Sequence, residues 1–219
     1  YLAGMMESVE DIPSSVILNG LSWDWESYGE YLDSLEKLEP AINLVGMVGH
    51  CAIRTYVMGE RGVDDEPTTD EIAQMAALAG KSVAEGAIGF SSSRLVAHKM
   101  PDGRSIPGTF ANTEEMVAIA KAVGDNNGLI QNVLEYSRLD TEMAQLREQA
   151  LAAQTRVIFT APHIPGESGK ANAYVDIIET MLAEGIDITG LALPRSFGFL
   201  SGLKTNIMFM SPAWKELIS

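Results

Sequence analysis

The sequence predicts an α/β fold in which the strands of a parallel sheet alternate with helices. Five short apolar runs have the length of strands, at residues 42–48, 87–91, 129–134, 156–161 and 186–192. They lack a strict polar and apolar alternation, which favours strands buried on both faces. A helical pattern fills every gap between them. Four successive β-α-β units follow, and such units require parallel pairing with right-handed crossovers.

Each predicted helix has a recognisable start. Thr68 and Glu71 form a capping-box pattern before an apolar stripe that ends at Glu85-Gly86. A second helix begins at Asn112-Thr113, a third at Asp140-Thr141, and a fourth at Ala171-Asn172 and closes at Gly185. The segment from Val9 to residue 41 predicts a loop and then an amphipathic helix that flanks the sheet. Its inward residues are Trp25, Tyr28, Tyr31, Leu32 and Leu35.

Two architectures accommodate such a sheet: an open doubly wound sheet and part of a (β/α)8 barrel. No G-x-G-x-x-G or G-x-x-x-x-G-K-[ST] motif follows any strand, so the nucleotide-binding form of the open sheet loses its main support. The barrel would need about three further strands, because a complete barrel has eight strands and ~250 residues. The chain also starts without Met, and we expect it to be a piece of a longer protein.

Composition excludes several classes of partner. The formal net charge is -15, with 30 acidic against 15 basic residues, so we expect neither nucleic acid nor a membrane surface to bind. A single cysteine cannot form an internal disulfide, and no apolar run approaches the ~20 residues of a membrane span. The N-terminus lacks the basic and apolar regions of a secretory signal, and a cytoplasmic location is therefore expected.

Polar side chains gather just after the predicted strands. In a parallel sheet these β-to-α loops converge on the face where ligands bind, although loops are polar in any case. All three histidines fall in these β-to-α loops. Two explanations remain open: the histidines form a functional cluster, or their positions coincide by chance. The residues are His50, Arg54, Ser91, Ser92, Ser93, Arg94, His98, Glu135, Tyr136, Arg138, His163 and Arg195.

The residues 49–62, GHCAIRTYVMGERG, are interpreted as the loop after the first strand. We expect His50 to be a supporting histidine that hydrogen-bonds a neighbouring loop, rather than a metal ligand. Arg54 is suited to bind a carboxylate or brace a loop, since its guanidinium stays charged. Cys51 as a nucleophile would need a paired base, and Ser91-Ser92-Ser93 lacks the G-x-S-x-G pattern. No H-x-H or H-E-x-x-H pair indicates a metal site.

Several motifs in a fixed order resemble one known family. They are VEDIP (9–13), LSWDWESYGEYLDSL (21–35), GHCAIRTYVMGERG (49–62), DEIAQM (70–75), GAIGFSSSR with His98, and DGRSIPGTFA (102–111). Together they resemble the N-acyl-D-amino-acid deacylase (D-aminoacylase) branch of the amidohydrolase superfamily.

The resemblance implies a TIM-like (β/α)8 barrel that hydrolyses an amide with a metal-bound water, usually with zinc or another divalent metal. It places this chain at about strands three to seven, an incomplete catalytic barrel over 1–219 with an entry loop and flanking helix at 1–40 and β-α units over 41–219. The family's H-x-H, its ligand cysteine and its catalytic aspartate would then lie outside the chain, so Cys51 is not that ligand. We expect this fragment alone to be inactive and to lack the main metal ligands.

The sequence departs from the family pattern where metal-ligand histidines are expected, after strands five and six. The first position holds Val133 or a neighbour, and His163 lies close to the second and is predicted as a metal ligand. Two hypotheses result: a metal-dependent hydrolase of carbon-nitrogen, non-peptide bonds in small linear amides, and a non-catalytic barrel that binds such a ligand. A homo-oligomer is compatible with both. The predicted substrate-binding or supporting residues are His50, Arg54, Ser92, Arg94, His98 and Arg195.

Overall fold

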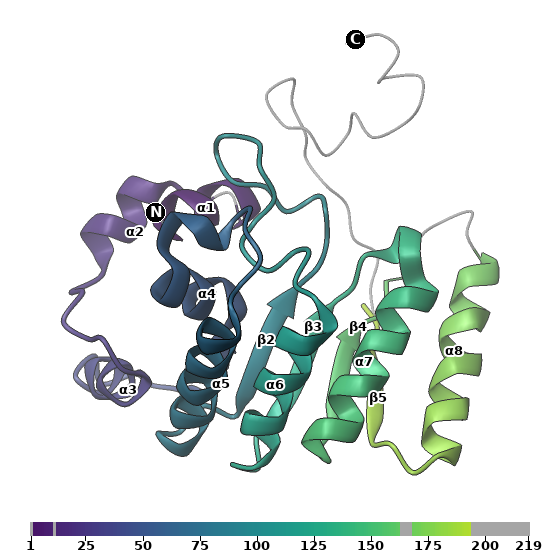
Figure 1. Ribbon diagram of the computed structural model, residues 1–219. Coiled ribbons are helices and arrows are strands. Elements are labelled where there is room, and N and C mark those ends of the chain that lie inside the picture. Colours follow the sequence, from purple (N-terminus) through teal and green to yellow (C-terminus); the bar gives the residue numbers. More distant parts are fainter. Residues whose placement is uncertain (1, 11, 163–167, 194–219) are drawn as a thin grey trace, which may run out of the picture.

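The chain folds around a five-stranded parallel sheet (Figure 1). This computed structural model describes residues 2–10, 12–162 and 168–193. The strands lie side by side in the order β1-β2-β3-β4-β5, which is also their order along the chain. They are β1 (Val48–Gly49), β2 (Gly89–Ser93), β3 (Leu129–Val133), β4 (Val157–Thr160) and β5 (Ile188–Leu191).

The strand order decides between the two predicted architectures. A doubly wound sheet reverses its order partway, whereas here every strand pairs with the next one along the chain. Successive right-handed crossovers in one direction place all the connecting helices on one face. Figure 1 shows α5, α6, α7 and α8 in a row across one face of the sheet. This is the arrangement of a barrel wall, and it confirms the predicted α/β class.

The four helices predicted between the strands begin close to their predicted starts. They are α5 (Thr69–Ala84), α6 (Thr113–Gly124), α7 (Leu139–Ala153) and α8 (Ser168–Ala183). The structure adds α4 (His50–Met58) and the 3-10 turns η1 (Gly59–Gly62) and η2 (Tyr136–Arg138). Thr68 caps α5 in the expected capping box with Glu71, and the Asn112 side chain accepts from the backbone of Glu115 at the start of α6. None of the helices in the described part of the chain is long and apolar enough to cross a membrane.

The N-terminal region contains more helix than the sequence predicts. Three helices precede the sheet: α1 (Leu2–Glu10), α2 (Ser14–Gly20) and α3 (Tyr28–Glu36). The prediction of a loop before the flanking helix is therefore wrong, because α2 occupies part of it. α3 is the predicted amphipathic helix, with a capping box between Ser27 and Glu30. Its inward residues are only half-buried, so α3 covers the flank of the sheet rather than entering the core.

The prediction of a strand over 42–48 is wrong for most of its length. Only Val48 and Gly49 pair in β1, whereas Ile42 and Val45 are 70% and 68% exposed. Among the described strands, β1 has a neighbour on one side only, which leaves the preceding apolar residues without a second partner. The stretch 49–62 is not a loop either, because it forms α4 and η1. Its buried stripe contains His50 and Arg54, and these polar residues hide the amphipathic pattern in the sequence.

The two faces of the sheet differ in what covers them. Phe90, Ile130, Val157 and Phe159 are fully buried against the helices, together with side chains such as Met75 and Leu146. The opposite face, called here the open face, carries the alternate residues of each strand. One row across it pairs Ser91 with Gln131, Gln131 with Ile158, and Ile158 with Thr189.

Candidate functional site

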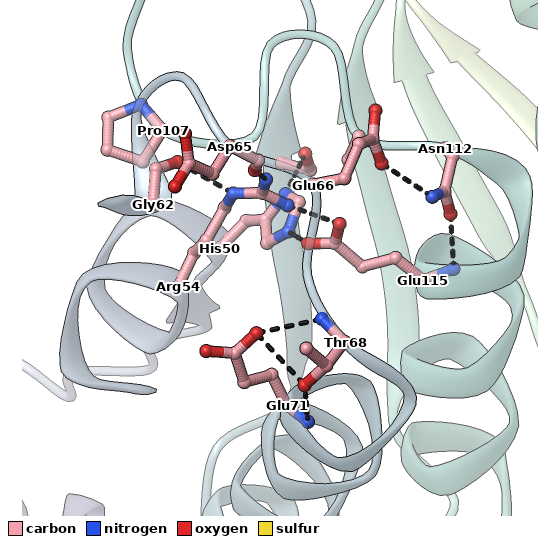
Figure 2. A network of polar contacts seen from close by, with 12 residues as sticks. His50, Arg54, Gly62, Asp65, Glu66, Thr68, Glu71, Pro107, Asn112 and Glu115 are labelled. Atoms are coloured by element: carbon pink, nitrogen blue, oxygen red, sulfur yellow. Dashed lines mark hydrogen bonds and ion pairs between the residues drawn. The ribbon is translucent and has the colours of Figure 1, made fainter. Parts of the chain in front are cut away.

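Three helix and strand ends meet at His50. The residue starts α4 directly after β1 and is 1% exposed. Its Nε2 lies 2.8 Å from Glu115 Oε1, and its Nδ1 lies 2.9 Å from the Ser92 hydroxyl on β2. Because a carboxylate only accepts, Nε2 donates to Glu115, and in the neutral ring Nδ1 then accepts from Ser92. Figure 2 shows the His50 ring and the Arg54 side chain converging on Glu115.

Glu115 is the acceptor at the centre of this network. It lies in the first turn of α6, where the helix dipole favours a negative charge, and its side chain is 0% exposed. Burial by itself raises the pKa of Glu115, but the hydrogen bonds and charges of His50 and Arg54 outweigh burial and lower the pKa below 4.5. The carboxylate is therefore ionised and paired at neutral pH.

Arg54 binds a carboxylate and braces a loop within the same chain. Its Nη1 donates to Glu115 Oε2, its Nε donates to the Gly62 carbonyl at 2.7 Å, and its Nη2 donates to the Asp65 carbonyl at 2.6 Å. These bonds connect α4 to α6 and hold the segment that leads into α5 (Figure 2). The Arg54 guanidinium is thus bonded within the chain at all three nitrogens, and its side chain is 6% exposed.

A second buried ion pair follows β2. Arg94 Nε donates to Glu142 Oε2 at 2.5 Å, and Arg94 Nη1 donates to the Ala111 carbonyl at 2.9 Å. Glu142 lies in the first turn of α7 and also accepts from Arg138 at 3.3 Å. Arg94 thus joins the end of β2 to α7 and to Ala111, two residues before α6.

The segment 94–112, called here the β2–α6 loop, lies beyond the carboxyl ends of β2 and β3. His98 in this loop is half-buried, with its Nδ1 2.8 Å from the Ser93 hydroxyl. Burial lowers the pKa of His98, and the nearby Glu10 opposes this. Glu135 after β3 accepts from the backbone of Val96 at 2.9 Å, which fastens the loop to β3. Among the predicted site residues that the structure describes, His98 is half-buried, whereas His50, Arg54, Ser92 and Arg94 are buried.

Cys51 has the environment of an unreactive thiol. It is half-buried and donates to the Pro107 carbonyl at 3.2 Å. Burial raises the pKa of the Cys51 thiol to about 11, which leaves it protonated at neutral pH. This agrees with the expectation that Cys51 takes no part in the chemistry.

The described side chains do not form a metal site. No group of three or more His, Cys, Asp or Glu residues in the described ranges is placed to hold an ion. Both ring nitrogens of His50 are engaged by Ser92 and Glu115, and both oxygens of Glu115 are engaged by His50 and Arg54. A metal ion at the loop end of this sheet would thus need ligands from elsewhere.

The predicted site residues separate into two groups and a remainder. His50, Arg54 and Ser92 form one buried network on the helix side of β2, in which His50 bonds β2 and α6 rather than the neighbouring loop that the sequence predicts. Arg94 belongs to the second ion pair, and His98 is half-buried in the β2–α6 loop. His163 and Arg195 lie outside the described residues. Of the three histidines, His50 starts a helix and does not lie in a loop.

Sequence reasoning missed the two glutamates on which these networks depend. Glu115 precedes the buried Ile119 by four residues and Val123 by eight, so it falls on the apolar stripe of α6. Glu142 stands in the same relation to Leu146 on α7. A carboxylate on a buried stripe needs a cationic partner, and that pattern was the available signal.

Comparison with known proteins identifies relatives of the chain. No family model matches it. A D-aminoacylase of Alcaligenes xylosoxydans xylosoxydans is 30% identical over 128 residues, which cover 58% of this chain and 24% of the relative. An N-acyl-D-aspartate deacylase of the same organism is 24% identical over 162 residues, 72% of this chain and 30% of the relative. An uncharacterized protein of Mycobacterium tuberculosis is 29% identical over 140 residues, 59% of this chain and 23% of the relative.

Solved structures agree with these relatives. A D-aminoacylase variant in complex with CuCl2 superimposes with a TM-score of 0.65 at 25% identity, covering 77% of this chain and 34% of the other. A D-aminoacylase crystal structure described as defining a novel subset of amidohydrolases gives a TM-score of 0.63 with the same identity and coverage. The chain spans about a quarter of the length of the curated relatives it matches, 23% to 30%.

The fold and the structural matches together define the chain as part of the wall of a (β/α)8-type barrel, similar to the corresponding part of D-aminoacylases. Its homologues and structural neighbours are D-aminoacylases, which confirms the resemblance that the sequence motifs indicate.

Proposed function

We propose that the chain is part of the catalytic barrel of a metal-dependent amidohydrolase that cleaves carbon-nitrogen, non-peptide bonds in linear amides, with N-acyl-D-amino acids as the substrate class. The observation that carries the proposal is the match of sequence and fold to D-aminoacylases over 58% and 77% of this chain. The single cysteine is compatible with a cytoplasmic location, which we include in the proposal.

The described residues contribute the frame of the proposed site. The buried networks of Glu115 and Glu142 hold the starts of α4, α6 and α7 against the carboxyl ends of the strands. Ligands bind at this end of a parallel (β/α)8 barrel. We propose that His98 contacts the substrate. We propose the same role for Arg195, which lies outside the described residues.

The proposed metal, zinc or another divalent ion, would take its ligands outside the described residues. The described donors do not fit an ion, because the oxygens and nitrogens near β1 and β2 are bonded to one another. His163, which lies outside the described residues, is a proposed metal ligand. We derive no catalytic step through the metal from this part of the chain.

Hydrolysis of N-acetylated amino acids tests the proposal in the protein that contains this chain. We expect release of free amino acid from N-acetyl-D-amino acids, measured by chromatography, and little release from the L-enantiomers. The activity should be lost with a chelator and restored by zinc. A metal-loaded, folded preparation that hydrolyses neither enantiomer would contradict the proposal.

The role of His98 is tested separately. His98→Ala should lower turnover about 100-fold or more, the effect typical of a lost proton-transfer or contact group, without changing the melting temperature. Asp102→Asn, at an exposed position in the same loop, is the control and should retain activity. Full activity of the His98 variant would remove His98 from the site while leaving the hydrolase proposal intact.

A second function is favoured by one specific observation. Val133 and Thr160 end β3 and β4 on the open face, where neither side chain is an ordinary metal ligand. This favours a barrel that binds an amide-like ligand without hydrolysing it. Elemental analysis separates the two functions: a full-length preparation without stoichiometric metal, and without activity on added zinc, would favour binding alone.

A further inference from the structure

We propose that His50 is a positioning residue for the β2–α6 loop. The loop rests on the imidazole ring through Gly108, and the position of the ring thereby sets where His98 lies over the ends of β2 and β3. This inference rests on the proposed function in one respect only, namely that His98 contacts the substrate. The structural connection itself can be tested without any activity.

Gly108 packs directly against the His50 ring. A methyl group added at Gly108 would lie 2.5 Å from His50 Nδ1 and 2.6 Å from Cε1, both well inside van der Waals contact. Gly108 also has φ +90°, a backbone conformation that L side chains rarely adopt. Only glycine therefore allows the loop backbone to lie this close to the imidazole.

The ring that supports Gly108 is held at both nitrogens and on one side. Ser92 binds Nδ1 at 2.9 Å and Glu115 binds Nε2 at 2.8 Å, so the two contacts come from β2 and α6. The Phe90 ring lies 5.3 Å away between centroids, tilted by 59°. Rotating the imidazole would break both hydrogen bonds in a buried site, which makes it a rigid support for the loop.

Backbone hydrogen bonds connect Thr109, the residue after Gly108, to His98 through Ile106. The Thr109 N–H donates to the Ile106 carbonyl at 3.2 Å, and the Ile106 N–H donates to the His98 carbonyl at 3.4 Å. Ile106 is itself buried with Met5 and Met100 in a small hydrophobic cluster. A shift of residue 108 away from the ring would therefore move the segment that carries His98.

Two glycines of the same loop give a matched experiment. Gly108 and Gly103 have φ +90° and φ +88°, but a Cβ on Gly103 would meet nothing within 4 Å. Gly108→Ala and Gly103→Ala thus share the backbone strain, and only the first displaces His50. In hydrogen exchange of the full-length protein we expect peptides from 94–112 to exchange about tenfold faster in Gly108→Ala than in Gly103→Ala. Peptides from 129–134 should be unchanged in both.

A second pair of variants keeps the test decisive if Gly108→Ala does not fold. Ser92→Ala removes the hydroxyl at His50 Nδ1, whereas Ser91→Ala removes a hydroxyl that bonds Gln131 on the open face. Only Ser92→Ala should shift the His50 imidazole signals in NMR spectra and speed exchange over 94–112. Equal exchange over 94–112 within each pair would overturn the proposal. A larger loss of turnover in Gly108→Ala and Ser92→Ala than in their matched controls supports the proposal. Inactivity of the wild type on every amide would contradict only the hydrolase proposal.

Discussion

At the scale of single residues, two buried glutamates hold the loop end of the sheet together. Glu115 and Glu142 are 0% and 2% exposed. Glu115 accepts from Arg54, which lies in the helix after β1, and Glu142 accepts from Arg94, which directly follows β2. A buried carboxylate is costly without such partners, and removing one partner leaves the other charge buried and unpaired. These pairs therefore specify which helix start lies against which strand end.

Glu115→Gln should lower the free energy of unfolding by about 3–5 kcal/mol at neutral pH, because Arg54 would stay buried without its counter-charge. Glu114→Gln, at the exposed neighbouring position, should change it by less than about 0.5 kcal/mol. Urea denaturation measures both. A Glu115 effect no larger than that of Glu114 would show that the network contributes little.

The effect of Glu115 should also depend on pH in one direction. Its pKa is lowered in the folded protein relative to 4.5, so the unfolded chain takes up the proton first on acidification. The stabilisation is then complete above about pH 4.5 and is lost as the pH falls through the lower, folded pKa. The difference between wild type and Glu115→Gln should shrink in acid, and a constant difference down to complete protonation would contradict the lowered pKa.

At the scale of elements, local signals specify the helices that cover the sheet better than they specify its edge. α5, α6 and α8 start or end at the capping residues and glycines that the sequence indicates, since these interactions lie within one turn of the chain. β1 and α4 depend on distant partners. The strand pairs only where β2 is available, and α4 buries His50 and Arg54 because Glu115 is there to bind them.

Thr68→Ala tests the local contribution to α5. The Thr68 hydroxyl accepts from the Glu71 N–H at 3.3 Å, and the Glu71 carboxylate accepts from the Thr68 N–H at 2.8 Å. Losing this cap should lower stability by about 1 kcal/mol. Thr69→Ala, one position along and exposed, should lie within about 0.5 kcal/mol of wild type in the same urea titration. Equal effects of the two variants would show that the capping box does not stabilise α5.

At the scale of the whole molecule, the sheet is asymmetric. The helices bury one face completely, while the open face carries half-buried and exposed side chains such as Ile158 and Thr189. In a closed (β/α)8 barrel this second face would be the packed interior. The coverage of a quarter to a third of the matched proteins is in keeping with a partial barrel wall.

Ile158→Ala tests that view in the protein that contains this chain. If the remaining strands of a barrel cover the open face, the substitution should cost about 2–5 kcal/mol, as for other buried isoleucines. Phe159→Ala, on the helix face and 0% exposed, is the reference and should cost a similar amount. A cost for Ile158→Ala below about 1 kcal/mol, with Phe159→Ala strongly destabilising, would show that the open face remains uncovered.

The sequence alone predicts the α/β class, four of the five strands, the approximate starts of α5, α6, α7 and α8, and the resemblance to D-aminoacylases. These depend on hydrophobic periodicity, capping and motif order, which act over short stretches of chain. Only the tertiary structure shows that Glu115 accepts from His50 and Arg54, that Glu142 accepts from Arg94, and that 49–62 is largely helical. The reason is that a buried polar residue takes its role from groups distant in sequence, here 65 residues away for His50 and Glu115.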